Sequence, residues 1–116
     1  MNKAFILLLI AFSGMLSGCG PKEPIKIGFM AELSGPQGAL GQDQYDAFMM
    51  VVERNGGKLG GVPVQIIRRD TQLKPEVANQ IADEMIEKEK VALVTGFSFS
   101  NILLAVNRKL TSAGIV

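Results

Sequence analysis

The spacing of hydrophobic and polar positions divides most of the chain into alternating strands and helices. Residues 25–31 (IKIGFMA) and 62–70 (VPVQIIRRD) have the apolar and β-branched composition of strands. Residues 91–95 (VALVT) form a continuous apolar run, which is typical of a strand buried on both faces of a parallel sheet. Three further segments repeat apolar residues at helical spacing: residues 43–55, the segment from Pro75 to position 86, and residues 101–110.

Three consecutive strand–loop–helix units predict an α/β fold, a three-layer αβα arrangement around a parallel sheet with right-handed crossovers. Asn55, Gly56 and Gly57 predict the end of the first helix and a turn. Ile115 and Val116 have the character of the first residues of a fourth strand. A sheet that stopped there would leave an unpaired apolar edge, so we expect residues 25–116 to be the front part of a larger protein, truncated at the start of strand four.

The first residues have the pattern of an export signal. Lys3 precedes an apolar run that is too short to span a bilayer, and small residues lead into Cys19. The segment L-S-G-C resembles the bacterial lipobox, which predicts a lipoprotein signal peptide over residues 1–18 and lipid attachment at Cys19. Residues 19–24 would then be a short tether, and two or three acyl chains would give a stable membrane anchor. The alternative is a plain signal peptide that happens to carry a cysteine.

Composition excludes several classes of function. Without Lys3, 11 basic residues balance 11 acidic ones, so the mature chain has no basic stripe for nucleic acid. The chain has no histidine, and its single cysteine is the predicted lipid site. Histidine acid–base chemistry, a cysteine nucleophile and a zinc site of the usual ligands are therefore absent. We expect no metal, no cofactor and no enzymatic activity, although carboxylate chemistry stays possible.

Ligands of an open parallel sheet bind at the carboxyl ends of its strands, which selects the loops at residues 32–42, 71–74 and 96–100. Glycines at positions 35, 38 and 41 of the first loop suggest a phosphate site, but no lysine follows them as a Walker loop requires. The loop is also longer than a dinucleotide-binding turn and contains Pro36. It either exposes backbone N–H groups to another ligand or is an ordinary connection.

The third loop leads into a helix, whose first N–H groups favour an anion. Ser98 or Ser100 could donate its hydroxyl to a ligand carboxylate there. The alternative is that one of them only caps the helix, which is the commoner role of serine at such a position.

Three segments together resemble a known family: IKIGFMAELSGPQGALGQD, NGGKLGGVPVQIIRRDTQLKPEVA and VALVTGFSFSN. They are similar to the beginning of the substrate-binding proteins of branched-chain amino acid ABC transporters, which have the type I periplasmic binding protein fold. The resemblance implies two lobes that close on a small ligand and deliver it to a permease, and residues 25–116 would be the incomplete N-terminal lobe. It assigns the ligand carboxylate to Ser100 and a contact with the ligand side chain to Leu40. Gly41, Phe97 and Ser98 are further candidate ligand contacts.

Departures from the family pattern bear on the ligand. Leu40 replaces a usual aromatic residue, and G-F-S-F-S-N looks more like relatives that bind aromatic or other organic acids than like amino acid binders. Where some relatives have a disulfide, this chain has Leu73 and Phe99, and we expect the two side chains to pack together. The alternatives to an exported solute-binding protein are an amide-sensing regulator of the same fold, a nucleotide-binding enzyme domain and a nonfunctional gene remnant.

Overall fold

The computed structural model describes residue 20 and residues 22–116, so the predicted signal peptide and Cys19 lie outside the described residues. A single sheet has the strand order β2-β3-β1-β4. Its strands are β1 (Ile25–Ala31), β2 (Lys58–Leu59), β3 (Val62–Asp70) and β4 (Leu93–Thr95). The helices are α2 (Gly38–Arg54), α3 (Pro75–Glu84), the π-helical turn η2 (Met85–Glu89) and α4 (Ser100–Ser112).

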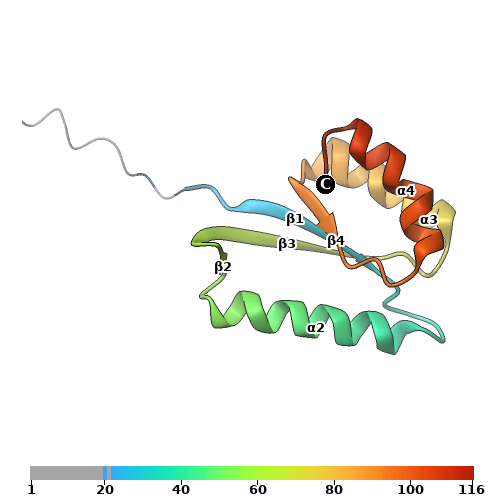
Figure 1. Ribbon diagram of the computed structural model, residues 1–116, viewed down its shortest axis with the longest axis horizontal. Helices are drawn as coiled ribbons and strands as arrows, with labels where there is room; N and C mark the ends of the chain where they lie inside the picture. The colour runs from blue at the N-terminus through green and yellow to red at the C-terminus, as the bar shows by residue number, and fades with distance from the viewer. Residues whose placement is uncertain (1–19, 21) are drawn as a thin grey trace, which may run out of the picture.

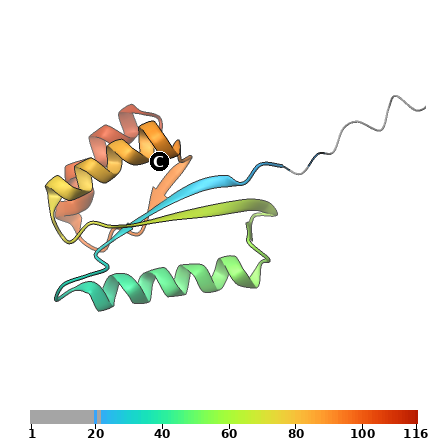
Figure 2. The same cartoon turned by 180° about the vertical axis from the view of Figure 1, so that it is seen from behind.

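The central strand β1 is parallel to both of its neighbours. Ile27 pairs with Ile66 of β3 on one side and with Leu93 of β4 on the other. Strand β2 was not predicted from the sequence; it forms a short antiparallel hairpin with β3 through the Leu59–Val62 pair. Figure 1 shows α2 on one face of the sheet and α3 with α4 on the other, and Figure 2 shows the same layers from behind. The predicted three-layer α/β arrangement is therefore confirmed.

Strand alternation gives each face of β1 its own cluster of side chains. Phe29 points to α2, where its ring lies 5.2 Å from that of Tyr45 and 5.4 Å from that of Phe48. Met30 is buried on the opposite face. The main core on that face consists of Met30, Ile67, Ala78, Ile81, Ala82, Met85, Val91, Val94, Ile102, Val106, Leu110 and Ile115.

Two predicted boundaries and one burial pattern differ from the structure. Helix α2 begins at Gly38, five residues before the predicted start, because the glycines assigned to a loop are already helical. Strand β4 begins at Leu93 rather than at position 91, and Leu93 is 37% exposed, so this strand is not buried on both faces. The Val94 amide donates to the Val116 carbonyl at 2.8 Å, but Ile115 and Val116 do not form a strand in the structure, so a fourth strand beginning there stays a prediction.

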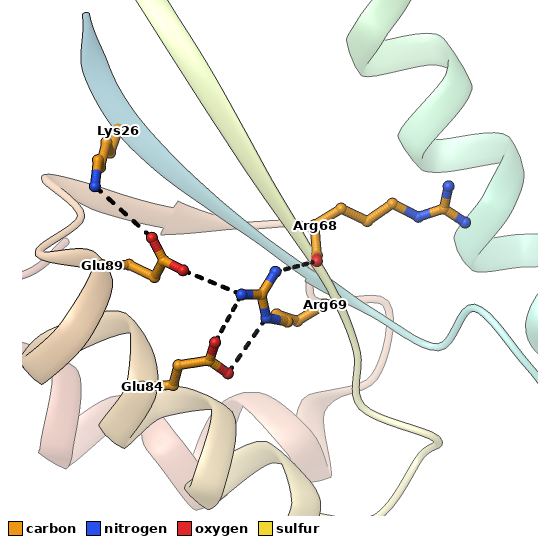
Figure 3. Close-up of polar contacts among 5 residues, drawn as sticks. All are labelled: Lys26, Arg68, Arg69, Glu84 and Glu89. Atoms are coloured by element: carbon orange, nitrogen blue, oxygen red, sulfur yellow. Dashed lines mark hydrogen bonds and ion pairs between the residues drawn. The ribbon is translucent and has the colours of Figure 1, made fainter.

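A polar network attaches η2 to the sheet, as Figure 3 shows. Arg69 of β3 donates to Glu84 at 2.6 and 3.3 Å and to Glu89 at 3.1 Å, and Lys26 of β1 lies 3.7 Å from Glu89. The hydrogen bond from Arg69 is the main reason why the pKa of Glu84 lies below its usual value. The adjacent Arg68 points to α2, where it donates to Gln42 at 2.6 Å. Successive arginines thus join β3 to both helical layers.

Candidate functional site

The carboxyl ends of β1, β3 and β4 meet at one edge of the sheet, where three loops precede helices. The first loop covers residues 32–37, shorter than the predicted 32–42, because α2 includes Gly38 and Gly41. The second covers residues 71–74 and the third residues 96–99. This edge is the place where an open parallel sheet binds its ligand.

The Asp70 carboxylate fastens the first loop to the second. Its Oδ1 accepts from the Leu33 and Gln72 amides, each at 2.9 Å. Partial burial acts to raise the pKa of the Asp70 carboxyl, but hydrogen bonds from Ser34, Leu33 and Gln72 outweigh burial and lower it. The charged carboxylate is therefore part of the folded arrangement of both loops.

A second link joins the same loops inside the protein. Thr71 and Glu32 are both fully buried, and the Thr71 hydroxyl donates to Glu32 Oε1 at 3.0 Å. Glu32 Oε2 is buried without a partner among the described residues. Glu32 is not predicted from the sequence as a buried residue of the site, because a carboxylate after a strand usually faces water.

The second loop holds two residues in a conformation that side chains disfavour. The Lys74 amide donates to the Thr71 carbonyl at 2.9 Å, and between them Gln72 and Leu73 have φ of 53° and 57°. Left-handed backbone costs about 1–2 kcal/mol for a residue with a Cβ. Strain of this kind persists where surrounding contacts impose it, as the Asp70 bond to Gln72 does here.

Gly41 lies where helix α2 crosses the end of β1. A Cβ added to Gly41 would lie 2.7 Å from the carbonyl carbon of Glu32 and closer still to its oxygen. The absence of a side chain therefore allows helix and strand backbones to touch. This packing role accounts for the glycine, and a ligand contact by Gly41 stays a prediction.

The third loop is attached to α2 through its first serine. Gly96 has φ of 103°, and a Cβ there would lie 2.9 Å from the Phe29 ring. Two residues later the Ser98 hydroxyl donates to Gln44 Oε1 at 2.7 Å. The α4 N-cap position is Phe99, and no side-chain capping bond forms there, so the interpretation of Ser98 or Ser100 as a helix cap is wrong.

Ser100 opens α4 and is exposed. Its hydroxyl has no hydrogen-bond partner in the part of the chain that the structure describes. The Ile102 and Leu103 amides donate to the Phe99 carbonyl at 3.2 Å, which leaves the amides before them free for another acceptor. A hydroxyl and unpaired N–H groups at a helix start can receive an anionic oxygen.

Two depressions open at this edge. One of about 490 Å³ lies between the first two loops and is lined by Ser34, Gly35, Pro36, Gln37, Gln72, Leu73 and Lys74. The other, of about 480 Å³, lies beside the third loop and is lined by Gln44, Val94, Thr95, Gly96, Phe97 and Leu103. The predicted contact Phe97 thus lines the second depression, and Ser98 is bonded to another residue of its wall.

Leu40 lies on α2 one turn before Gln44, rather than in a loop as expected, and it is 46% exposed. Residues four apart share a helix side, so Leu40 is on the side that faces Ser98. Leu73 and Phe99 both pack against the main core, but their direct contact stays a prediction. Within residues 20 and 22–116, no group of acidic side chains is arranged to hold a metal, and no helix is long and apolar enough to cross a membrane.

Comparison with known proteins decides the family. The model of the family described as "Periplasmic binding protein" matches residues 24–116. The chain belongs to the periplasmic binding protein family. A Leu/Ile/Val-binding protein homolog of Brucella abortus is 27% identical over 107 residues, which are 91% of this chain and 27% of the relative. The resemblance inferred from the motifs is thereby confirmed.

Solved structures of binding proteins have the same fold. An ABC transporter substrate-binding protein from Sphaerobacter thermophilus is 35% identical with a TM-score of 0.75, over 80% of this chain and 25% of that one. A solute binding protein of an R. palustris ABC transporter in complex with 4-hydroxybenzoate is 32% identical with a TM-score of 0.73, over 80% and 26%. This periplasmic binding protein chain spans about a quarter of the length of these relatives.

Proposed function

We propose that this chain forms one wall of the ligand pocket in the extracytoplasmic solute-binding component of an ABC importer. The ligand is a small carboxylic acid, either an amino acid or an aromatic or other organic acid. The arrangement at the start of α4 carries the proposal. The Ser100 hydroxyl and the amides beside it have no partner among the described residues, and they lie at the edge where the three loops meet. Relatives named for Leu/Ile/Val binding and for 4-hydroxybenzoate support this ligand class.

Each predicted contact has a role in the proposal. Ser100 and the α4 amides bind the ligand carboxylate, since a charge-assisted hydrogen bond is stronger than a neutral one. Leu40 and Phe97 contact the apolar body of the ligand. Gly41 and Ser98 support them, Gly41 by letting α2 approach β1 and Ser98 through Gln44. The groups that recognise the rest of the ligand, and the contacts with a permease, belong to the whole protein.

Titration calorimetry on the whole natural polypeptide tests the proposal. We expect one-to-one binding of at least one of leucine, isoleucine, valine, benzoate and 4-hydroxybenzoate, and a loss of at least tenfold in affinity in Ser100→Ala. Ser112→Ala is the matched control, because Ser112 is an exposed serine at the other end of the same helix. The proposal fails if none of these acids binds, or if the two alanine variants have the same affinity.

The proposal includes export and anchoring through Cys19, which the L-S-G-C segment supports. Cells labelled with radioactive palmitate should incorporate it into the wild-type protein and not into Cys19→Ser. If neither protein is labelled, Cys19 is not acylated and the plain signal peptide is the remaining interpretation; equal label in both proteins would place the acyl chain at another residue.

A further inference from the structure

The side chain of Gln44 is oriented by the third loop. It is partly buried on the side of α2 that faces residues 96–99, and its Oε1 accepts the Ser98 proton at 2.7 Å. Because the oxygen of the amide points to Ser98, the Nε2 group points elsewhere. The Gln44 Nε2 group has no acceptor among the described residues, and it is not buried away from solvent. Gln44 also lines the depression of about 480 Å³. Two N–H donors are therefore available at that wall.

Ser98 provides the complementary group. Its proton is used in the bond to Gln44, while the lone pairs of its oxygen can still accept a hydrogen bond. The pair thus presents a donor and an acceptor side by side. A hydroxyl group needs this combination, because it donates one hydrogen bond and accepts others.

The walls of the depression define the kind of molecule that would carry the hydroxyl. Val94, Phe97 and Leu103 are apolar, and Thr95 adds one neutral hydroxyl. Among the described residues that line it, none is charged. A neutral polar group on a hydrocarbon or aromatic body fits such walls better than an ammonium or a second carboxylate, whose burial without a partner is costly.

We propose that Gln44 and Ser98 recognise a hydroxyl group on the body of the ligand and so make the pocket selective for hydroxylated carboxylic acids. This inference rests on the proposed function, because it takes the depression beside Phe97 as part of the ligand pocket. Gln44 is the donor to the hydroxyl oxygen, and Ser98 Oγ is the acceptor of its proton. A site that hydrogen-bonds a ligand hydroxyl discriminates strongly against an analogue that lacks the hydroxyl. An apolar site discriminates only weakly against an analogue that carries an additional hydroxyl.

Matched ligand pairs test the inference in the whole natural polypeptide by titration calorimetry. The pairs are the three monohydroxybenzoates against benzoate, and threonine against valine, which has nearly the same shape. In at least one pair, we expect the hydroxylated acid to bind at least tenfold more tightly than its counterpart without the hydroxyl group. In Gln44→Leu the ratio of the two affinities should fall to near one, because only the hydroxylated acid should bind more weakly.

Two further variants separate recognition from folding. Gln44→Met keeps the length of the side chain but removes the N–H donors, so it should lose the selectivity and still unfold cooperatively. Gln42→Leu is the control, because Gln42 lies on the flank of α2 that contacts Arg68. The affinity ratio of this variant should equal that of the wild type. If parent acids bind but hydroxylation brings no gain in affinity, or if Gln44→Met keeps the full affinity ratio, this inference is wrong and the proposed function stands. If none of the acids in these pairs binds, the inference is wrong, and titration with leucine and isoleucine then decides the proposed function.

Discussion

Replacing Gly41 by alanine should separate α2 from the sheet, although alanine is the better helix former. The added Cβ would lie 2.7 Å from the Glu32 carbonyl carbon and 3.2 Å from its amide nitrogen, whereas carbon atoms in contact are about 3.5–4.0 Å apart. Both neighbours are backbone atoms of a buried residue, so no side-chain rotation relieves the overlap. The helix would have to move away from β1 by about 1 Å.

The expected cost follows from two opposing effects. Alanine in place of glycine favours a helix by about 1 kcal/mol. Overpacking costs about 1–3 kcal/mol, and the upper end applies because moving α2 also pulls Tyr45 and Phe48 from the Phe29 ring. We expect a net loss of about 2 kcal/mol. The shift would also displace Leu40 and Gln44 from the third loop, so ligand affinity should fall with stability.

Gly38 provides the matched control in the same turn of α2. A Cβ there would lie 3.2 Å from the backbone of Leu33, a contact that a small adjustment relieves, so Gly38→Ala should be within about 0.5 kcal/mol of the wild type. The measurement is amide hydrogen exchange of α2 in the ligand-free protein, together with the unfolding midpoint. Equal protection of α2 in the two variants would refute the assignment of Gly41 to close backbone packing.

Three further predictions concern the loops and the polar network. Asp70→Ala should lower the free energy of unfolding by about 1–3 kcal/mol, because it leaves the Leu33 and Gln72 amides without their acceptor. Since folding lowers the pKa of Asp70, this stabilisation should be complete above the unfolded pKa of about 4 and disappear as the pH falls through the folded value; a pH-independent difference in urea titrations would contradict it. Arg69→Met should cost about 1 kcal/mol or less at neutral pH. This cost should shrink as the pH falls below the unfolded pKa of about 4 and through the folded pKa of Glu84, which the hydrogen bond from Arg69 lowers. A cost that 1 M salt leaves unchanged would argue against an ionic origin. Gln72→Gly should raise the free energy of unfolding by up to about 1 kcal/mol, because φ is 53° there. The control Gln65→Gly, at an exposed position of β3, should lower it. Shifts of the melting temperature in the same direction for both variants would show that Gln72 is not strained.

The long elements follow from local patterns, so the sequence alone predicts them. The composition of residues 25–31 and 62–70 gave the bounds of β1 and β3, because apolar and β-branched residues favour strands. Strand β2 has only two residues and no periodicity to detect. Its available signal was Gly60-Gly61 between Leu59 and Val62, since two glycines suit a two-residue hairpin turn.

The errors at the site come from tertiary contacts that override local preference. Gly41 was assigned to a loop, although its close contact with the Glu32 backbone makes glycine the residue that fits there within a helix. Gln44 has no recognisable motif, and its partner Ser98 is 54 residues away in the sequence. A polar residue on a helix flank is usually solvated, so only the folded arrangement reveals its orientation.

The attachments of the three loops differ in a way that bears on how ligand preference can change. Asp70 and the buried Thr71–Glu32 bond hold the first two loops together, so a substitution in either would disturb the other. The third loop is joined to α2 by the single side-chain bond between Ser98 and Gln44. Pre-organised loops reduce the entropy lost on binding, which favours affinity for any ligand of the class. Substitutions at Gln44 and Ser98 leave the Asp70 and Glu32 links intact, so they should change which ligand is preferred. Substitutions at Asp70 or Glu32 should instead weaken the binding of every ligand.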